Sequence, residues 1–546
     1  MLNYYSPLAR RWLVAGCFVL WLGLTLGLTA PQEQFPGESA KWTHYQSPNF
    51  ELYSGNSESD SRDLLFKMEV LRAIFLEKFK VKERRPLPVT VYYFRSEKTF
   101  RGYTPEAYKQ NDKFNGYCIA RPDRSVIVMA PAEDEDRAQR TVFHEYIHHL
   151  MRVTEQNPPT WYNEGTAEIY STIKIEGGKV ELGHPPAGRL YELQQEKLLP
   201  LEQLFSTTYG SSVYTQGKHT GVFYAQSWAL LHFCYFGQSD IPREKFELFL
   251  KVARSPKYID PEKVKEICQE LLGMDYTKLN QELNHYVRSG RYSYGKFAQP
   301  PVAGIKTYAM RSVPAVEISD RLAELEFRVN HTGQARLALL QLAERNPADP
   351  RPHEVLGSQA LLEGDTTRAR EIWTKAIALG SENPAVFHEL GQLESRQWFA
   401  RMDLYFRLPD ELATHLRELL HHSIKVAPHQ SAAYEMLAWV EATAKEPDVA
   451  NINLVQEHFP ELTDKKRSLL ALALVRWRKD DLKTATTILD ELAKMEPDAW
   501  VQHGAETLRA KIEGRTPKRP APSATPGPRI KVMPIKQPKM RLPTGN

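Results

Sequence analysis

Residues 141–150 read Thr-Val-Phe-His-Glu-Tyr-Ile-His-His-Leu, and residues 161–168 read Trp-Tyr-Asn-Glu-Gly-Thr-Ala-Glu. Residues four apart lie on one face of a helix, so a helix over the first segment places the imidazoles of His144 and His148 side by side. Glu145 stands next to them on that helix. Two histidines at this spacing, with an adjacent glutamate that handles protons, are typical of a catalytic zinc site.

A catalytic zinc takes three protein ligands and leaves a fourth position open, so one more ligand is expected. Glu164 is the first candidate, because it lies beyond the helix-breaking Asn157-Pro158-Pro159, in the first turn of a second helix. Glu168 shares its helix face and is the alternative ligand. With Glu164 as the ligand, Glu168 is expected to accept a hydrogen bond from His144 and so to fix the tautomer of that ring.

A site of this kind predicts metal-assisted hydrolysis of an amide bond. One zinc ion per chain would lower the pKa of a water molecule to about 7 and polarise the scissile carbonyl. Glu145 would take the proton from that water and pass it to the leaving amine. His149 points about 100 degrees round the helix from His148, so it is predicted to be a polar flank and not a ligand.

The two segments resemble those of the gluzincin metallopeptidases, in which a two-histidine helix is followed by a helix that opens with Asn-Glu. They also resemble the bacterial peptidase-MA-like domains. These open with an extended Ser-x-x-Phe segment, here Ser47 to Phe50, and contain a Trp-x-x-Glu-Gly-x-Ala-Glu helix. The resemblance covers residues 45–290 and implies an α+β, thermolysin-like zinc metallopeptidase domain.

The resemblance also implies roles for individual residues. His144, His148 and Glu164 would bind zinc, and Glu145 would be the general base. Tyr224, which opens the sequence Tyr-Ala-Gln-Ser, matches a tyrosine that donates its hydroxyl to the developing oxyanion in the aminopeptidases. The alternative is that Tyr224 is a half-buried core residue, as tyrosines on amphipathic helices commonly are.

Two departures from the family pattern limit what it implies. The spacing from His148 to Glu164 is shorter than in thermolysin or the aminopeptidases, and the Gly-x-Met-Glu-Asn segment that holds a substrate's amino terminus is absent. Exopeptidase action is therefore not expected. In gluzincins the strand before the zinc helix is a sheet edge on which the peptide is laid, and residues 124–130 occupy the equivalent place.

Periodicity predicts the remaining elements of this domain. We expect a strand at 47–53, a helix at 61–79, strands at 88–94 and 125–129, a hairpin at 172–182 and helices over much of 221–289. Residues 291–316, rich in proline, glycine and tyrosine, show no clear period and are predicted to be a linker.

The N-terminal residues 1–30 indicate export. Arg10-Arg11 precede an uncharged apolar stretch from Trp12 to Ala30, which predicts either a secretory signal peptide or a membrane anchor. The bulk of the chain is then periplasmic, secreted or anchored outside the cytoplasm. The net charge is +4 with no basic stripe interleaved with aromatics, so no nucleic-acid partner is expected. Four cysteines at wide spacing predict no disulfide framework.

Residues 317–513 contain a repeat at intervals of 34 residues, because Leu322-Ala323 matches Leu356-Gly357 and then Leu390-Gly391. The pattern of small residues resembles a tetratricopeptide repeat, which implies an all-α solenoid with a groove for peptides or partner proteins. A simple spacer is the alternative. Residues 514–546 are basic and proline-rich without an acidic residue, so this tail is predicted to be disordered.

Two functions follow from these patterns. The first is an exported zinc metallopeptidase that cleaves peptide or protein substrates and uses its repeats to bind a partner or substrate. The second is a non-catalytic envelope scaffold that acts through the repeats. Glu145 favours the first, because loss of the general base is the usual mark of an inactive relative.

Overall fold

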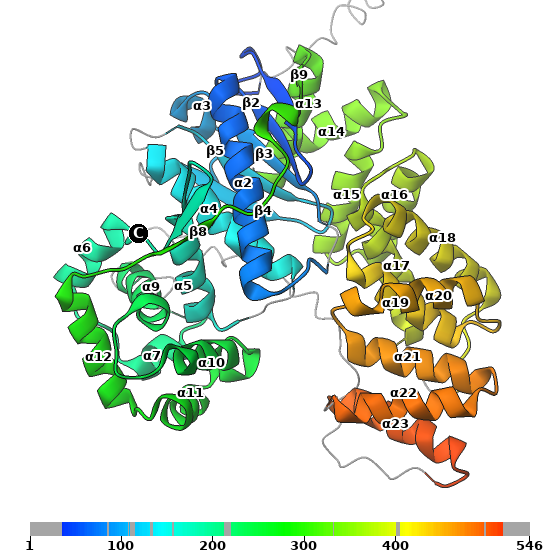
Figure 1. The fold of residues 1–546 in the computed structure, drawn as a ribbon. Helices are drawn as coiled ribbons and strands as arrows, with labels where there is room; N and C mark the ends of the chain where they lie inside the picture. The colour runs from blue at the N-terminus through cyan, green and yellow to red at the C-terminus, as the bar shows by residue number, and fades with distance from the viewer. Residues whose placement is uncertain are drawn as a thin grey trace, which may run out of the picture.

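The computed structural model describes residues 35–84, 87–106, 109, 115–131, 135–154, 158–211, 220–330, 332–399, 405–495 and 498–516. The apolar stretch at 12–30 and nearly all of the basic tail lie outside these residues. Within them, a six-stranded sheet is combined with many helices, which is compatible with the predicted α+β class (Figure 1). None of the helices in the described ranges has both the length and the apolar composition that a membrane span requires.

The main sheet has the strand order β4-β5-β3-β2-β1-β9. Its strands are β1(Thr43–Gln46), β2(Phe50–Ser54), β3(Val89–Tyr93), β4(Gly116–Ala120), β5(Ser125–Met129) and β9(Ala309–Ser312). Strands β2, β3 and β5 run parallel, whereas β4, β1 and β9 pair antiparallel with their neighbours. The expected strands at 88–94 and 125–129 are β3 and β5. The expected strand at 47–53 begins instead at Phe50, because Pro48 lies in the turn between β1 and β2.

The prediction that residues 124–130 form the sheet edge is wrong. Strand β5 lies between β3 and β4, and Cys118 of β4 pairs with Ile127 of β5. Among the described strands, β4 is the edge on this side. Its sequence, Gly-Tyr-Cys-Ile-Ala, does not alternate between polar and apolar residues, so the pattern by which short strands are identified is missing.

Both faces of the sheet are covered. Along β5, Ile127 and Met129 join the core beneath α2(Glu58–Phe79) and α4(Glu135–Val153), while Val126 and Val128 join a second core on the other face. That second core includes Ile318, Leu322 and Leu325 of α13(Ala315–Asn330). The first helix of the predicted repeat region is therefore a layer of the sheet domain, and the predicted boundary at 316/317 runs through a shared core.

A helical lobe follows α4 and lies at the lower left of Figure 1. It contains α5(Thr160–Ser171), α6(Ala187–Gln195), α7(Leu201–Ser206), α9(Thr220–Phe236), α10(Arg243–Ala253), η2(Pro256–Ile259), α11(Pro261–Ile267), η3(Cys268–Leu272) and α12(Tyr276–Ser289). The predicted hairpin at 172–182 is formed by β6(Lys174–Glu176) and β7(Lys179–Leu182), with Gly177 and Gly178 both at positive φ in the turn.

The segment predicted to be a linker is built into both sheets. β8(Gly295–Ala298) pairs with β7, and β9 pairs with β1 after the short 3-10 turn η4(Ile305–Thr307). Backbone pairing of this kind needs no alternating side-chain pattern, so these strands leave no period in residues 291–316.

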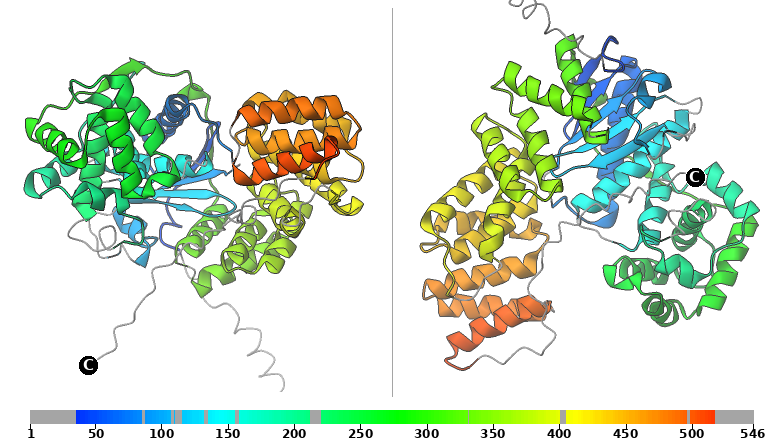
Figure 2. Two further views of the ribbon diagram at one scale, coloured as in Figure 1. Left: turned by 90° about the horizontal axis from the view of Figure 1, so that it is seen from below. Right: turned by 180° about the vertical axis from the view of Figure 1, so that it is seen from behind.

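From α13 onward the chain is a stack of helices (Figures 1 and 2). The further helices are α14(Gly333–Arg345), α15(Arg351–Leu362), α16(Thr366–Ala378), α17(Pro384–Phe399), α18(Asp410–Val426), α19(Ser431–Thr443), α20(Val449–Glu457), η5(Phe459–Glu461), α21(Lys465–Arg478), α22(Leu482–Lys494) and α23(Ala499–Ile512). The close approach of α15 to α16 requires a small residue, because a Cβ at Gly357 would lie 2.5 Å from the Trp373 ring.

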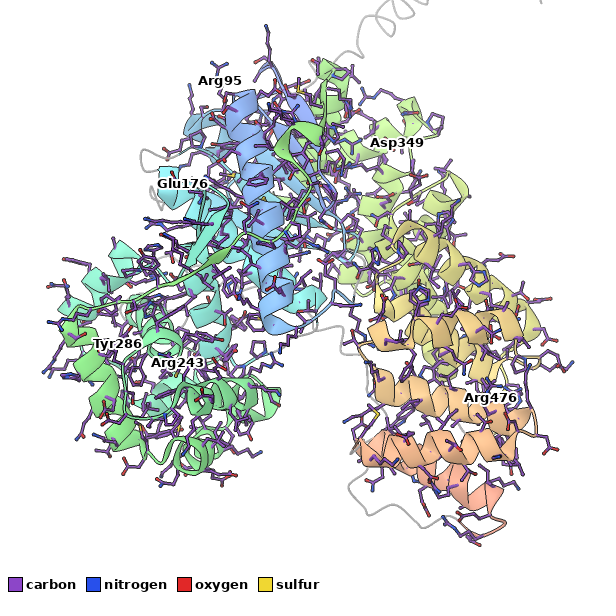
Figure 3. The ribbon with its side chains drawn as sticks, viewed as in Figure 1. Arg95, Glu176, Arg243, Tyr286, Asp349 and Arg476 are labelled. Carbon is purple, nitrogen blue, oxygen red and sulfur yellow. The ribbon has the colours of Figure 1, made fainter. Side chains whose placement is uncertain are left out.

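Buried ion pairs join the stack to the sheet, and we call this group the junction cluster. Figure 3 shows side chains filling the space between the strands and the first stack helices; Asp349, labelled there, lies just before α15. The shortest contacts join Asp123 to Arg328 at 2.6 Å and Arg124 to Glu354 at 2.8 Å. The full cluster consists of four carboxylates and four arginines: Glu51, Asp123, Glu324, Glu354, Arg124, Arg321, Arg328 and Arg351.

Candidate metal centre

Helix α4 presents the predicted two-histidine motif at the boundary between the sheet and the lobe. The helix packs against β4, β5, α2 and α5. Its apolar side chains recur at the spacing of one helix face, and this fixes the rotation of α4: Val142, Phe143, Tyr146, Ile147 and Leu150 are all buried. His144, Glu145 and His148 fall on the remaining face and are half-buried.

Helix α5 brings Glu164 to the two histidines. It begins after Pro159 and is buried along nearly its whole length. Gly165 allows a close crossing with α9, because a Cβ there would lie 2.5 Å from the carbonyl oxygen of Ser227. The glycine after Glu164 thus lets α5 approach α9, which carries Tyr224.

Three ligand atoms converge at this point. The Nε2 atoms of His144 and His148 are 3.1 Å apart, and the Oε2 atom of Glu164 lies 3.3 Å from each of them. Glu164 is fully buried, whereas both rings are partly exposed. Among the described residues, this is the only group of three or more histidine, cysteine, aspartate or glutamate side chains with the geometry to hold a metal ion.

The spacing of these atoms fits a tetrahedral zinc ion. Donor atoms about 2.0–2.1 Å from a tetrahedral metal lie about 3.3–3.4 Å from one another. The three observed distances of 3.1 and 3.3 Å are close to that value. Two imidazoles and one carboxylate are also the ligand set of one common class of catalytic zinc site.

The electrostatics of the cluster favour a cation. Burial acts to lower the pKa of His148, but the Glu164 carboxylate outweighs it and raises the pKa to about 9. Burial likewise acts to raise the pKa of Glu164, and the two histidines bring it far below its usual range. The three side chains from α4 and α5 therefore stabilise positive charge beside a carboxylate, and a bound metal ion would supply such a charge.

The outer nitrogen of each ring faces a different partner. His148 Nδ1 is 3.1 Å from the Asn163 Oδ1 atom, so the ring donates there and leaves Nε2 free to bind a metal. His144 Nδ1 is 3.6 Å from the nearest oxygen of Glu168, which is longer than a hydrogen bond. Arg189 of α6 instead donates to Glu168 at 2.6 and 3.0 Å. The expected hydrogen bond from His144 is thus missing from this geometry, although the two groups are neighbours.

Glu145 is half-buried on α4, the helix that packs against the edge strand β4. Its negative charge acts to raise the pKa values of His148, of Tyr209 and of Cys118 on β4. Burial, assisted by Glu145, raises the pKa of Cys118 to about 12. The thiol therefore stays protonated at neutral pH, and Cys118 does not belong to the described group of converging ligand atoms.

Two tyrosines border the cluster. The ring centre of Tyr224 is 6.0 Å from that of His144, and the Arg189 guanidinium lies over the Tyr224 ring at 4.9 Å. Tyr209 is 48% exposed, and its hydroxyl accepts a hydrogen bond from Asn163. Desolvation of this hydroxyl, together with the charges of Glu164 and Glu145, raises its pKa. Tyr209, Asn163 and Arg189 were not predicted as site residues, and only Asn163 had a sequence signal, as the asparagine of the Asn-Glu pair.

His149 differs from the predicted polar flank. It is buried, its Nδ1 atom is 2.8 Å from Ser125 Oγ of β5, and its ring stacks on Tyr146. In the lobe, buried His232 contacts the hydroxyl of Tyr286 (labelled in Figure 3) at 2.6 Å, and the role of this pair is structural.

The chain matches no model of a known protein family and no curated protein.

Proposed function

We propose that this chain is an exported zinc metallopeptidase that hydrolyses peptide bonds. The observation that supports this most strongly is the triangle of ligand atoms from His144, His148 and Glu164, with Glu145 next to His144 on α4. These three residues would hold a zinc ion, which would supply the Lewis acidity that activates water and polarises the amide carbonyl.

The remaining steps belong to residues of the chain. Glu145 accepts the proton of the attacking water and delivers it to the leaving nitrogen. Tyr224, beside the His144 ring, donates its hydroxyl to the oxyanion that develops on the carbonyl. Asn163 holds His148 in the tautomer that leaves Nε2 as the ligand atom.

The sheet and the lobe form a thermolysin-like domain in this proposal. The edge strand β4, packed beside α4, replaces β5 as the strand on which an extended peptide is laid. Cys118 on β4 lies close enough to Glu145 for its pKa to respond to that charge, so a peptide along β4 passes the catalytic helix.

The helical stack is a set of tetratricopeptide-like units in this proposal. Small buried residues support it: Gly357 and Ala360 of α15 and Ala369 of α16 allow the close crossing around Trp373. Helices α13 and α15 face the sheet, so the surface for a protein partner lies on the later helices, away from the junction cluster.

The decisive experiment compares the full chain with Glu145→Gln at equal zinc content on a mixed peptide library, with cleavage sites read by mass spectrometry. Cleavage by the wild type alone supports the peptidase. Equal cleavage by both proteins rejects the role of Glu145. No cleavage by either favours the alternative, a non-catalytic envelope scaffold that acts through its repeats.

A further inference from the structure

Residues 81–84 lie between the metal-site helix and the helical stack. The segment leaves α2 after Lys80, whose left-handed φ of 52° turns the chain away from the helix. The Arg84 amide donates to the carbonyl oxygen of Val153, the last residue of α4, at 2.7 Å. The Arg84 carbonyl accepts from the amide of Ala432 in α19 at 3.2 Å. The backbone of one residue thus bridges α4 and the stack.

Side chains hold this bridge in place. Both Nε and Nη2 of Arg84 are 2.7 Å from a carboxylate oxygen of Glu435, a residue of α19 that is only 5% exposed. The other oxygen of Glu435 accepts from the backbone amides of Thr463 and Asp464 at 2.9 and 2.8 Å. Every oxygen of this buried carboxylate is therefore engaged, so Glu435 fixes the guanidinium in one position.

A second set of contacts links the helical stack to α4 through the sheet. Arg328 of α13 binds the carboxylate of Asp123, and the Asn383 side chain donates to the backbone carbonyl oxygen of Asp123 at 3.1 Å. Two residues later, the Ser125 hydroxyl meets His149 of α4 at 2.8 Å. His149 adjoins His148, so both contacts from the stack end near the metal-binding turn of α4.

We propose that Arg84 is a positioning residue for the metal centre and that the stack, through Glu435, braces the C-terminal end of α4. The inference rests on the proposed function and deepens it. His148 is five positions before Val153, so a shift of the last turn moves its ring relative to Glu164. Displacements on the order of 1 Å in catalytic groups lower rates by about 100-fold, so the brace sets both metal affinity and turnover.

The test uses Glu435→Gln and Arg84→Gln in the full chain, with Glu441→Gln as the matched control. Glu441 lies on the same helix and is equally buried, but its carboxylate pairs with Arg417 inside the stack at 2.7 and 2.8 Å. Hydrogen exchange of α4 is measured in the metal-free protein. The zinc Kd, kcat and KM are then measured well below the unfolding temperature.

The brace predicts at least tenfold faster exchange in residues 146–153 for Glu435→Gln and Arg84→Gln. It also predicts a zinc Kd weakened by about tenfold, and a fall in kcat with KM nearly unchanged. Arg84→Lys keeps the charge and restores most of the protection. Glu441→Gln lowers only the Tm of the protein.

Unchanged exchange in folded Glu435→Gln, or equal changes in Glu441→Gln, would overturn the inference. Wild-type protein that neither binds zinc nor cleaves peptides would instead refute the proposed function. The exchange measurement needs no metal, so the two failures are distinguishable.

Discussion

The metal centre and the junction cluster both gather charged side chains from distant parts of the chain, but they balance charge differently. In the junction cluster, arginines face carboxylates at contacts as short as 2.6 Å between Arg328 and Asp123. At the metal centre, the Glu164 carboxylate faces two imidazoles. Imidazoles carry positive charge only when protonated, whereas guanidinium groups carry it always.

Under the proposed function, this difference separates a structural cluster from a metal site. Burial acts to raise the pKa of Asp123, but Arg328 outweighs it and holds the pKa below its ordinary value, so the pair remains charged. At the metal centre the positive charge is exchangeable, because His148 can release its proton to make room for a metal ion. A buried acid beside groups that can lose their proton is therefore suited to bind a cation, whereas an acid paired with arginine holds two parts of the fold together.

The largest expected difference comes from removing one carboxylate from each cluster. Glu164→Ala should abolish zinc binding and leave the fold intact, because it removes a metal ligand. Glu354→Ala should keep zinc binding but destabilise the protein by about 3–5 kcal/mol, because it removes the nearest acid of buried Arg124 and the acceptor of Ser381 and Asn383. Isothermal titration with zinc and urea unfolding measure the two effects. If Glu354→Ala lost zinc binding while Glu164→Ala retained it, the roles assigned to the two clusters would be reversed.

Substitution of the two tyrosines tests their different roles at the proposed metal centre. Tyr224→Phe should lower kcat by about 100-fold with zinc affinity unchanged, because it removes an oxyanion donor. Tyr209→Phe should have a smaller effect, about tenfold, and should act on zinc affinity through Asn163 and His148. Zinc titration of each variant and steady-state kinetics at saturating zinc are the two measurements. A larger loss in kcat for Tyr209→Phe would transfer the donor role to Tyr209.

Acid should weaken the junction cluster before it affects the cores. The folded-state pKa values of Glu51, Asp123 and Glu324 all lie below their ordinary values: burial acts to raise them, and the arginines outweigh it. Their contribution to stability is therefore fully present above about pH 5 and is lost as the pH falls below about 4. Urea unfolding between pH 7 and pH 3 should show this loss, and Glu324→Gln should reduce it. If the stability of Glu324→Gln fell with pH as steeply as that of the wild type, Glu324 would not contribute to the pH dependence.

The parts that sequence analysis predicted are those carried by local spacing. His144 and His148 share a face of one helix, and Glu164 lies on the next helix, which packs against it, so the three residues are close in sequence as well as in space. The strands β3 and β5 and the β6–β7 hairpin were likewise predicted, because valine-rich runs and a Gly-Gly turn are local signals.

The contacts that sequence analysis missed join residues far apart in the chain. Arg124 and Glu354 are separated by 230 positions, and Arg84 and Glu435 by 351. Nothing in the spacing of such residues indicates that they meet. Backbone pairing leaves little trace in side-chain patterns. For this reason the sequence did not indicate that β4 is the sheet edge in place of β5, or that β8 and β9 pair within the two sheets.

The most direct test of the central claim is X-ray absorption at the zinc edge of the full chain loaded with one equivalent of zinc. The account predicts four light donors at about 2.0–2.1 Å, with the outer-shell scattering of two imidazoles and no sulfur. His144→Ala should lose zinc binding as Glu164→Ala does, so the zinc edge should be absent from this variant after unbound metal is removed. A sulfur shell near about 2.3 Å, or a wild-type spectrum without imidazole scattering, would contradict the assignment of His144, His148 and Glu164.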